Sequence, residues 1–245
     1  MMKKLIIGLF ALLPTFAMAA GPSVPLLESN HDLTDNASLQ RGAKLFMNYC
    51  LGCHQMQYQR YERTFRDIGI PVEIGQETLI FDDSKVGSHI KNSIEIDDAA
   101  KWFGAPPPDL TLVARVRGAD WIYTYLKSFY VDESRPFGVN NSVFPSVGMP
   151  HVLQELQGVP TARFEEVEEH GVKVQKVVEI TTDGSGEMST DEYDQAVRDL
   201  TNFLAYVGEP TRLKSEALGY KVLGFLVILF ILAFFLKKEY WRDVH

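Results

Sequence analysis

The stretch Cys50-Leu51-Gly52-Cys53-His54 decides which fold is expected for this chain, because it holds the only two cysteines among 245 residues. Cys-x-x-Cys-His is the attachment sequence of c-type haem. Two thiols three positions apart on a helical turn reach the two vinyl groups of one porphyrin, and the adjacent histidine lies under the iron as the proximal ligand. The motif therefore predicts one covalently attached haem c, held by Cys50 and Cys53 with His54 on the iron.

Three other uses of such a motif fit the sequence less well. A thioredoxin-like redox pair needs a preceding strand in a βαβ setting, and no such pattern precedes Cys50. A zinc site needs a second pair of ligands, and the chain has no further cysteine. A structural disulfide that spans only two residues would be strained.

The motif is predicted to end a helix. Asp35 or Asn36 can cap its start, and apolar residues then recur at helical spacing, namely Leu39, Ala43, Phe46 and Tyr49 or Cys50. The chain is expected to turn at Gly52. Gly42 either marks a close approach by another helix or is a glycine that the helix merely tolerates.

A six-coordinate electron carrier needs a second axial ligand, usually methionine or histidine. Outside the leader described below, the methionines are Met47, Met56, Met149 and Met188. Met149 is the preferred ligand because Gly148 and Pro150 hold it in a stiff, extended turn. His151 is the alternative, and an open sixth position is the third possibility.

Both ends of the sequence contain a hydrophobic stretch. Residues 1–19 combine Lys3 and Lys4, a 12-residue apolar run and Ala17-Met18-Ala19, which predicts a signal peptide cleaved near Ala20. A retained anchor is the alternative, although the run is short for a bilayer. Residues 217–236 carry fifteen successive apolar residues from Val222 to Leu236, which favours a transmembrane helix over a buried soluble one.

These two stretches predict three regions: a signal peptide at 1–19, an exported domain at 20–211, and an anchor with a short cytoplasmic tail at 212–245. The exported domain holds 16 Lys/Arg and 29 Asp/Glu, a balance of −13. Such a surface steers basic partners. The net charge of −8 for the whole chain argues against a nucleic-acid partner.

Other segments carry clear local signals. Ala105-Pro106-Pro107-Pro108-Asp109-Leu110 cannot be helical and is expected to run extended, either along a porphyrin edge or as a rigid linker. Residues 110–130 are predicted as helix, with Arg115 or Arg117 as a partner of a haem propionate or as plain surface residues. Residues 164–181 predict a β-hairpin with its turn at 170–171. Ser189 and Glu192 predict a capping box for a helix that runs to about Val207.

The order and spacing of five segments resemble the cytochrome c1 family. These segments are CLGCH (50–54), APPPDL (105–110), ARVRGADWIYTYLKSFY (114–130), FPSVGMPHVL (144–153) and the C-terminal anchor. These proteins are the haem-bearing membrane subunits of ubiquinol–cytochrome c oxidoreductase (cytochrome bc1) complexes. The resemblance implies a mainly α c-type cytochrome domain with long loops, a small β-hairpin insertion and one transmembrane helix. It also implies Met149 as axial ligand, Arg117 near a propionate, and Pro108 and Trp121 near the ring, although Trp121 stands where the family often has tyrosine.

The resemblance further implies a function. The chain would take one electron from a Rieske iron–sulfur protein and pass it to a soluble or tethered cytochrome c, beside a cytochrome b subunit and membrane lipid. It would be an electron-transfer subunit rather than a catalyst on its own, in a bacterial inner membrane with its main domain in the periplasm. Two rival functions remain, namely another anchored cytochrome that serves an oxidase or reductase, and a haem-based sensor with an open sixth site.

Overall fold

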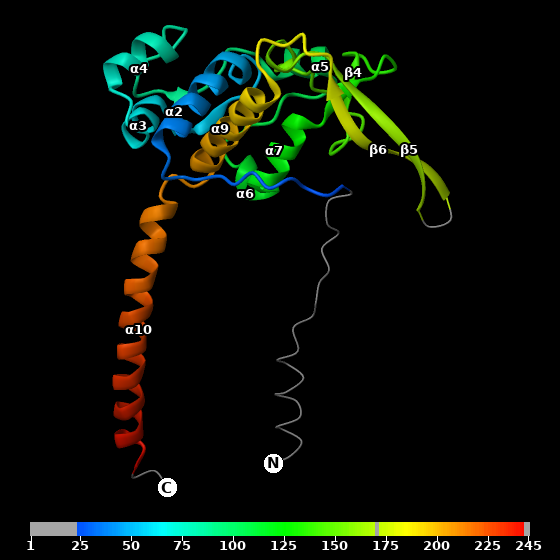
Figure 1. Cartoon of the computed structure of the whole chain (residues 1–245). Coiled ribbons are helices and arrows are strands. Elements are labelled where there is room, and N and C mark those ends of the chain that lie inside the picture. Colours follow the sequence, from blue (N-terminus) through cyan, green and yellow to red (C-terminus); the bar gives the residue numbers. More distant parts are fainter. Residues whose placement is uncertain (1–23, 170–171, 243–245) are drawn as a thin grey trace.

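A computed structural model describes residues 24–169 and 172–242, so the predicted signal peptide at 1–19 lies outside the described residues. The described chain is mainly α (Figure 1). Its longer helices are α2 (Asn36–Leu45), α4 (Val72–Leu79), α5 (Ile96–Phe103), α7 (Ala119–Lys127), α9 (Thr190–Gly208) and α10 (Arg212–Tyr240). The shorter ones are η1 (Phe46–Cys50), α3 (Tyr61–Asp67), α6 (Val113–Arg117) and α8 (Gln154–Gln157).

The strands of the described chain form three antiparallel pairs. These pairs are β1 (Met56–Arg60) with β2 (His89–Ile90), β3 (Phe129–Val131) with β4 (Val139–Asn141), and β5 (Pro160–Glu169) with β6 (Val172–Thr182). Sheet therefore contributes little to the core, which is built from helix against helix.

The predicted helix before the haem motif is confirmed. Asp35 caps α2, and its carboxylate accepts a hydrogen bond of 3.0 Å from the Ser38 amide. The last turn of the helix then widens into the π-helical turn η1, closed by a 2.9 Å bond from the Leu51 amide to the Phe46 carbonyl. The sequence did not predict this π turn, which ends directly on Cys50.

The predicted capping box of the late helix is also confirmed. The Ser189 hydroxyl accepts from the Glu192 amide while the Glu192 carboxylate accepts from the Ser189 amide, at the start of α9. The apolar face of α9 is fully buried at Val197, Leu200 and Phe203. This face crosses α2 and forms the centre of the domain (Figure 1).

Gly42 lies where α2 and α9 come closest. A Cβ atom at this position would lie 2.0 Å from the Asp199 carbonyl oxygen and 2.7 Å from the Phe203 Cβ atom. The glycine therefore marks a close approach of two helices, the first of the two possibilities that the sequence left open.

We expect Gly42→Ala to destabilise the domain by more than about 3 kcal/mol, because overpacking a core costs about 1–3 kcal/mol even where side chains can move. Here the clash is with backbone, which moves less easily. Chemical denaturation of the full chain followed by circular dichroism measures the loss. Gly87→Ala is the control, since nothing lies within 4 Å of a Cβ atom there. Equal unfolding midpoints for the two variants would contradict the close approach.

A charged cluster joins α7 to α9. Lys127 and Arg198 both pair with the Asp194 carboxylate, the latter at 2.9 Å, and the Tyr123 hydroxyl donates to the same group. Burial raises the pKa of Asp194, but hydrogen bonds from Lys127, Tyr123 and Arg198 outweigh it and lower the pKa to about 2. The ionised carboxylate therefore stabilises the folded state.

This cluster predicts acid sensitivity. Because the folded pKa of Asp194 lies below its unfolded value, its stabilisation is complete above about pH 4 and is lost as the pH falls toward 2. The loss should be about 2 kcal/mol. Denaturant titrations at several pH values measure it, and Asp194→Asn should be less stable at pH 7 and show a shallower acid slope. An acid slope unchanged in that variant would rule the cluster out.

The prediction of one helix over 110–130 is wrong. Gly118 has a φ of +90° and separates α6 from α7, and Phe129–Val131 form strand β3. The positive φ suits glycine because it has no Cβ atom. This break lets the two helices run in different directions, so that Arg115 and Arg117 meet different neighbours.

The hairpin predicted at 164–181 is confirmed and is somewhat longer. Strands β5 and β6 pair from Pro160 opposite Thr182 outward, with one register shift between Arg163 and Phe164. The predicted turn at 170–171 lies outside the described residues. At its base, Phe164 packs edge-on against Tyr130, with ring centroids 5.6 Å apart. The hairpin otherwise projects from the domain as a separate arm (Figure 1).

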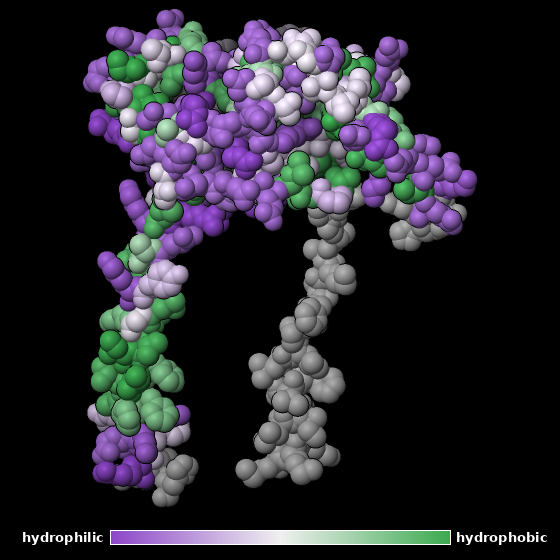
Figure 2. Space-filling model, in the orientation of Figure 1, coloured by the Kyte–Doolittle hydropathy of each residue, from purple (hydrophilic) through white to green (hydrophobic). Residues whose placement is uncertain are grey.

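Helix α10 leaves the domain as a long rod (Figure 1). Its 29 residues are long and apolar enough to cross a membrane, and none of them is buried against the rest of the described chain. Figure 2 shows its apolar middle as a continuous band that ends in hydrophilic residues at the far tip. The alternative of a buried soluble helix therefore does not apply.

Candidate haem site

The two cysteines sit on one tight turn at the end of η1. The Cys53 and His54 amides both donate to the Cys50 carbonyl, at 3.1 Å and 2.8 Å. Both thiols are free, with Cys50 buried and Cys53 partly exposed. Burial, and secondly the nearby Cys53, raise the pKa of the Cys50 thiol to about 12. The motif follows a helix rather than a strand, unlike the thioredoxin-like arrangement considered above.

His54 is held in one orientation by the proline segment. Its Nδ1 atom lies 2.8 Å from the Pro108 carbonyl oxygen. Because a carbonyl can only accept, Nδ1 carries the proton and Nε2 keeps its lone pair for a metal ion. Burial lowers the pKa of His54, although the bond to Pro108 and the nearby Asp109 oppose this shift. A neutral imidazole of this tautomer is the form that ligates iron.

The predicted extended segment at 105–110 is confirmed, and it is pinned to the haem motif. The Leu110 amide donates to the Gln55 carbonyl at 2.9 Å, and the Gln57 amide donates to the Asp109 carboxylate at 2.8 Å. Just before the segment, the Phe103 carbonyl oxygen lies 3.4 Å from the Cβ position of Gly148. One strap of chain thus touches both the His54 turn and the loop that carries Met149.

Met149 lies in a loop whose backbone is fixed by neighbouring side chains. The Asn141 side chain donates to the Tyr125 carbonyl at 2.8 Å and accepts from the Val143 and Phe144 amides. The Tyr125 hydroxyl donates to the Met149 sulfur at 3.3 Å. The thioether therefore has a defined position, because its sulfur is oriented by the hydroxyl of a partly buried tyrosine.

Two aromatic residues of α7, Tyr125 and Trp121, lie next to each other on the side of the helix that contacts Met149. Trp121 stacks on Tyr125 with ring centroids 5.0 Å apart, and the Arg117 guanidinium lies 5.0 Å from the centre of the Trp121 ring. Arg115 points elsewhere and pairs with Glu209 at 3.3 Å. Of the two arginines offered for a propionate, only Arg117 lies beside the residues around Met149.

His151, the alternative axial ligand, is committed to protein contacts. Its ring stacks on Phe129 with centroids 4.8 Å apart, and its Nε2 atom lies 2.6 Å from the Gln157 side-chain oxygen. Burial lowers the pKa of His151 to about 4, even though the bond to Gln157 opposes the shift. These contacts favour Met149 over His151 as the group available to iron.

The residues present fit a haem c. They supply two free thiols on one turn, a neutral histidine with Nε2 available, and a thioether oriented by a hydrogen bond. Two contributors to the site were not predicted from the sequence, namely the Pro108 carbonyl as partner of His54 and the Tyr125 hydroxyl as donor to Met149. The helical i, i+4 spacing of Trp121 and Tyr125 was the one signal in the sequence that placed the tyrosine beside the predicted site.

Comparison with known proteins agrees with this chemistry. Cytochrome c1 of Allochromatium vinosum is 55% identical to this chain over the full length of both proteins. The ammonia monooxygenase gamma subunit of Nitrosomonas europaea is 41% identical over 100% of this chain and 99% of its own length. The mitochondrial cytochrome c1 haem protein of Saccharomyces cerevisiae is 27% identical over 86% of this chain and 68% of its own. The model of the cytochrome C1 family matches residues 28–244, and the chain therefore belongs to the cytochrome c1 family.

Proposed function

We propose that this chain passes single electrons from a Rieske iron–sulfur protein to a cytochrome c-type acceptor within a cytochrome bc1 complex. Membership of the cytochrome c1 family makes it a bc1-type cytochrome with a c-type haem. The observation that carries the proposal is the Cys50–His54 turn, whose histidine is held by Pro108 in the tautomer that ligates iron. No bond of a substrate is made or broken by the chain itself.

Each site residue then has a role. Cys50 and Cys53 would attach one haem c, and His54 and Met149 would hold its iron. When bound, the haem would supply one-electron redox chemistry, and this ligand pair favours a higher potential than two histidines. Arg117 would pair with a propionate, because a guanidinium fork matches a carboxylate. Pro108 orients His54 through its carbonyl, and Trp121 lies between Arg117 and Tyr125.

The chain's own contribution is rigidity. The π turn, the chain segment 103–110 and the Asn141 hydrogen bonds hold the backbone around the histidine and the thioether in place. A site that moves little has little to rearrange when the charge on the iron changes. His54 is buried, whereas Met149 is only partly buried.

The proposed location follows from the two ends of the chain. We place the domain at 20–211 in the periplasm of a bacterium, after removal of a signal peptide at 1–19, with residues 212–245 as a single-pass inner-membrane anchor and short cytoplasmic tail. The length and apolar composition of α10 support the anchor. Contact with membrane lipid follows from it.

The proposed partners are a cytochrome b subunit, a Rieske protein and a cytochrome c. Electron-transfer partners meet through small, short-lived interfaces, where charge steers association more than buried area does. The balance of −13 over residues 20–211 suits a basic acceptor. Raised ionic strength should therefore slow the reaction with that acceptor.

Purification of the full chain in mild detergent tests the proposal. A pyridine haemochrome spectrum should show one haem c per chain, and a b-type cytochrome and an iron–sulfur protein should co-purify. A colourless chain would overturn the proposal. Ready binding of carbon monoxide to the reduced protein would indicate a sensor with an open sixth site instead.

A second candidate function is electron transfer, through the same haem, to or from an enzyme other than a cytochrome bc1 complex. The Nitrosomonas relative, named as an ammonia monooxygenase subunit and 41% identical, is the observation that favours it. Co-purification with an oxidase, reductase or monooxygenase in place of a b-type cytochrome would select this candidate.

The hydrogen bond from Tyr125 to Met149 predicts a change in potential. A hydroxyl that donates to the thioether sulfur withdraws electron density from it, which favours the reduced iron. Tyr125→Phe should lower the potential by about 20–60 mV, the equivalent of one hydrogen bond of about 0.5–1.5 kcal/mol. A redox titration measures it. Tyr123→Phe is the matched control on the same helix, because its hydroxyl donates to Asp194 instead. Equal potentials in the two variants would remove Tyr125 from this role.

A further inference from the structure

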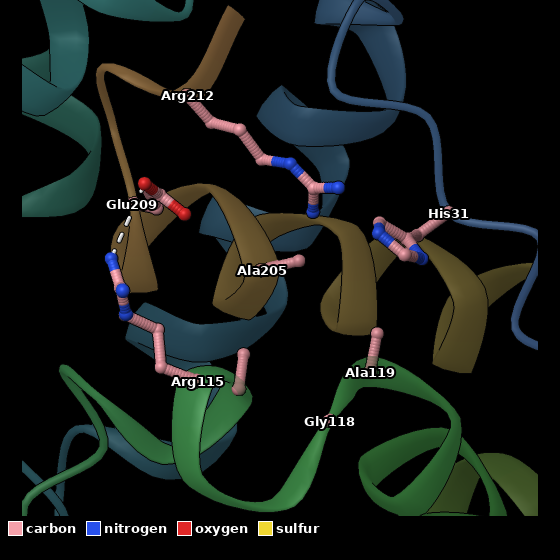
Figure 3. Close-up of a pocket in the computed structure, with 8 residues that line it drawn as sticks. His31, Arg115, Gly118, Ala119, Ala205, Glu209 and Arg212 are labelled. Carbon is pink, nitrogen blue, oxygen red and sulfur yellow. Dashed lines mark ion pairs between the residues drawn. The ribbon is translucent and has the colours of Figure 1, made fainter. Parts of the chain in front are cut away.

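A cavity of about 360 Å³ lies at the base of the domain, apart from the haem site. It is open to solvent on one side and is lined by the short helix α6, the start of α7, the end of α9, the first residue of α10 and His31. Its walls include the small residues Ala114, Gly118, Ala119 and Ala205, which leave the interior open (Figure 3). The space is large enough to receive a group the size of a phosphate ester.

The polar side chains of this cavity are mainly basic. Arg115, Arg212 and His31 come from three separate parts of the chain and line the same hollow. Figure 3 shows the Arg115 side chain turned toward Glu209, and the Arg212 and His31 side chains on the other side of Ala205. Glu209 is the acidic residue in its wall, and it pairs with Arg115 at 3.3 Å. Arg212 also pairs with Glu216, at 2.9 Å, one turn along α10. Arg115 belongs to the domain at 20–211, whose balance is −13, and Arg212 is the first residue of the anchor region.

The cavity also lies where the domain meets the proposed membrane surface. Arg212 is the first residue of α10, and α6 lies on the side of the domain from which α10 leaves (Figure 1). Next to Arg115 on α6, Val116 is 78% exposed, and Leu112, the residue before α6, is 46% exposed. Apolar side chains that stand beside arginines at this level match a lipid, whose headgroup is charged and whose chains are not.

We propose that this cavity binds the phosphate group of an anionic phospholipid from the outer leaflet of the membrane. The proposal rests on the membrane anchoring proposed above. Arginine forks bind phosphate oxygens bidentately, and the two arginines that line the cavity come from different elements, α6 and α10. A free phosphate has the same charged group, but it has no acyl chains that could contact the exposed Leu112 and Val116 side chains. The bound lipid would join the foot of the domain to the start of its anchor.

Native mass spectrometry of the full haem-loaded chain, extracted from membranes in mild detergent, tests the proposal. The probes are a phosphatidylglycerol, a phosphatidylcholine with the same acyl chains, and inorganic phosphate. We expect phosphatidylglycerol to bind more tightly than either of the others. Equal binding of the two lipids would overturn the proposal, and equal binding of inorganic phosphate and phosphatidylglycerol would overturn the assignment to lipid.

Charge-neutralising variants locate the site. Arg115→Gln and Arg212→Gln should each weaken phosphatidylglycerol binding about tenfold, the loss expected for one charge-assisted hydrogen bond. Lys214→Gln is the matched control, since it removes the same charge from the same helical turn but does not line this cavity. Lys214 lines a neighbouring hollow, which Arg212 and Glu209 also line. Glu209→Gln should strengthen binding, because it removes the acidic group and frees Arg115. Weakening by Lys214→Gln equal to that by Arg212→Gln would show non-specific attraction and overturn the proposal.

The same samples separate this proposal from the proposed function. Haem content and extraction from the membrane fraction are read on every variant before lipid is added. Absence of haem from the chain, or its recovery outside the membrane fraction, would contradict the proposed function. A haem-loaded, membrane-bound chain that shows no preference for phosphatidylglycerol would contradict only the proposed lipid site.

Discussion

Replacing Met149 with leucine should lower the reduction potential of the attached haem by roughly 0.3 V, within the range of about 0.8 V that axial ligands span. Leucine keeps the volume of the side chain but has no sulfur to offer the iron, so the loop should keep its packing on Phe129 and Val147. A six-coordinate haem with a methionine ligand would become a five-coordinate or water-bound one. Redox titration and the visible spectrum both report this change, and the reduced variant should bind carbon monoxide readily.

The control for this experiment is Met188→Leu. Met188 is another methionine that packs against the core, and it lies in the loop that leads into α9. Its replacement should leave the spectrum and the potential unchanged. If Met149→Leu also left both unchanged, Met149 would not be the ligand, and His151 would have to exchange its contacts with Phe129 and Gln157 for the iron.

The double variant Cys50→Ser, Cys53→Ser should lose covalent haem completely. Serine hydroxyls do not form thioether bonds with the vinyl groups, so haem staining of the denatured chain should fall to background. The chain should also be less stable, since Cys50 is part of the main core cluster beside Phe46 and Met47. Heat-denatured, haem-stained gels of the membrane fraction measure the first effect.

Two comparisons make this result specific. Met149→Leu should keep full covalent staining, because the thioether bonds do not depend on the sixth ligand. Either single cysteine variant should retain at most partial staining through its one remaining thiol. Full staining of the double variant would contradict attachment at this motif and remove the basis of the proposed function.

Local signals in the sequence predicted the elements that local chemistry determines. The Asp35 cap, the Ser189 and Glu192 capping box, the hairpin and the long apolar helix are each specified by residues close in sequence. The cysteine motif needs only five adjacent residues, so it could be identified without any knowledge of the fold. In each of these features, the residues that interact in the folded chain are also close to one another in the sequence.

The features that were missed depend on tertiary contacts. Nothing in the sequence tied the Pro108 carbonyl to His54, which lies 54 positions away. The Tyr125 bond to Met149 likewise requires α7 and the loop after β4 to meet. Gly118 is visible in the sequence, but the helical pattern on both sides of it favoured one continuous helix. Only its φ of +90° shows that the glycine ends α6.

The connection between α9 and α10 is only residues 209–211, and hydrogen bonds from the Glu209 amide to Tyr206 and from the Arg212 amide to Glu209 stiffen it, each at 3.0 Å. So short a connection contains no flexible linker that would let the haem domain move away from its anchor. In the proposed arrangement the iron keeps a constant height above the bilayer, and the carriers on either side must travel to it. The pace of electron delivery would then be governed by the mobility of those carriers, while this chain remains a stationary meeting point.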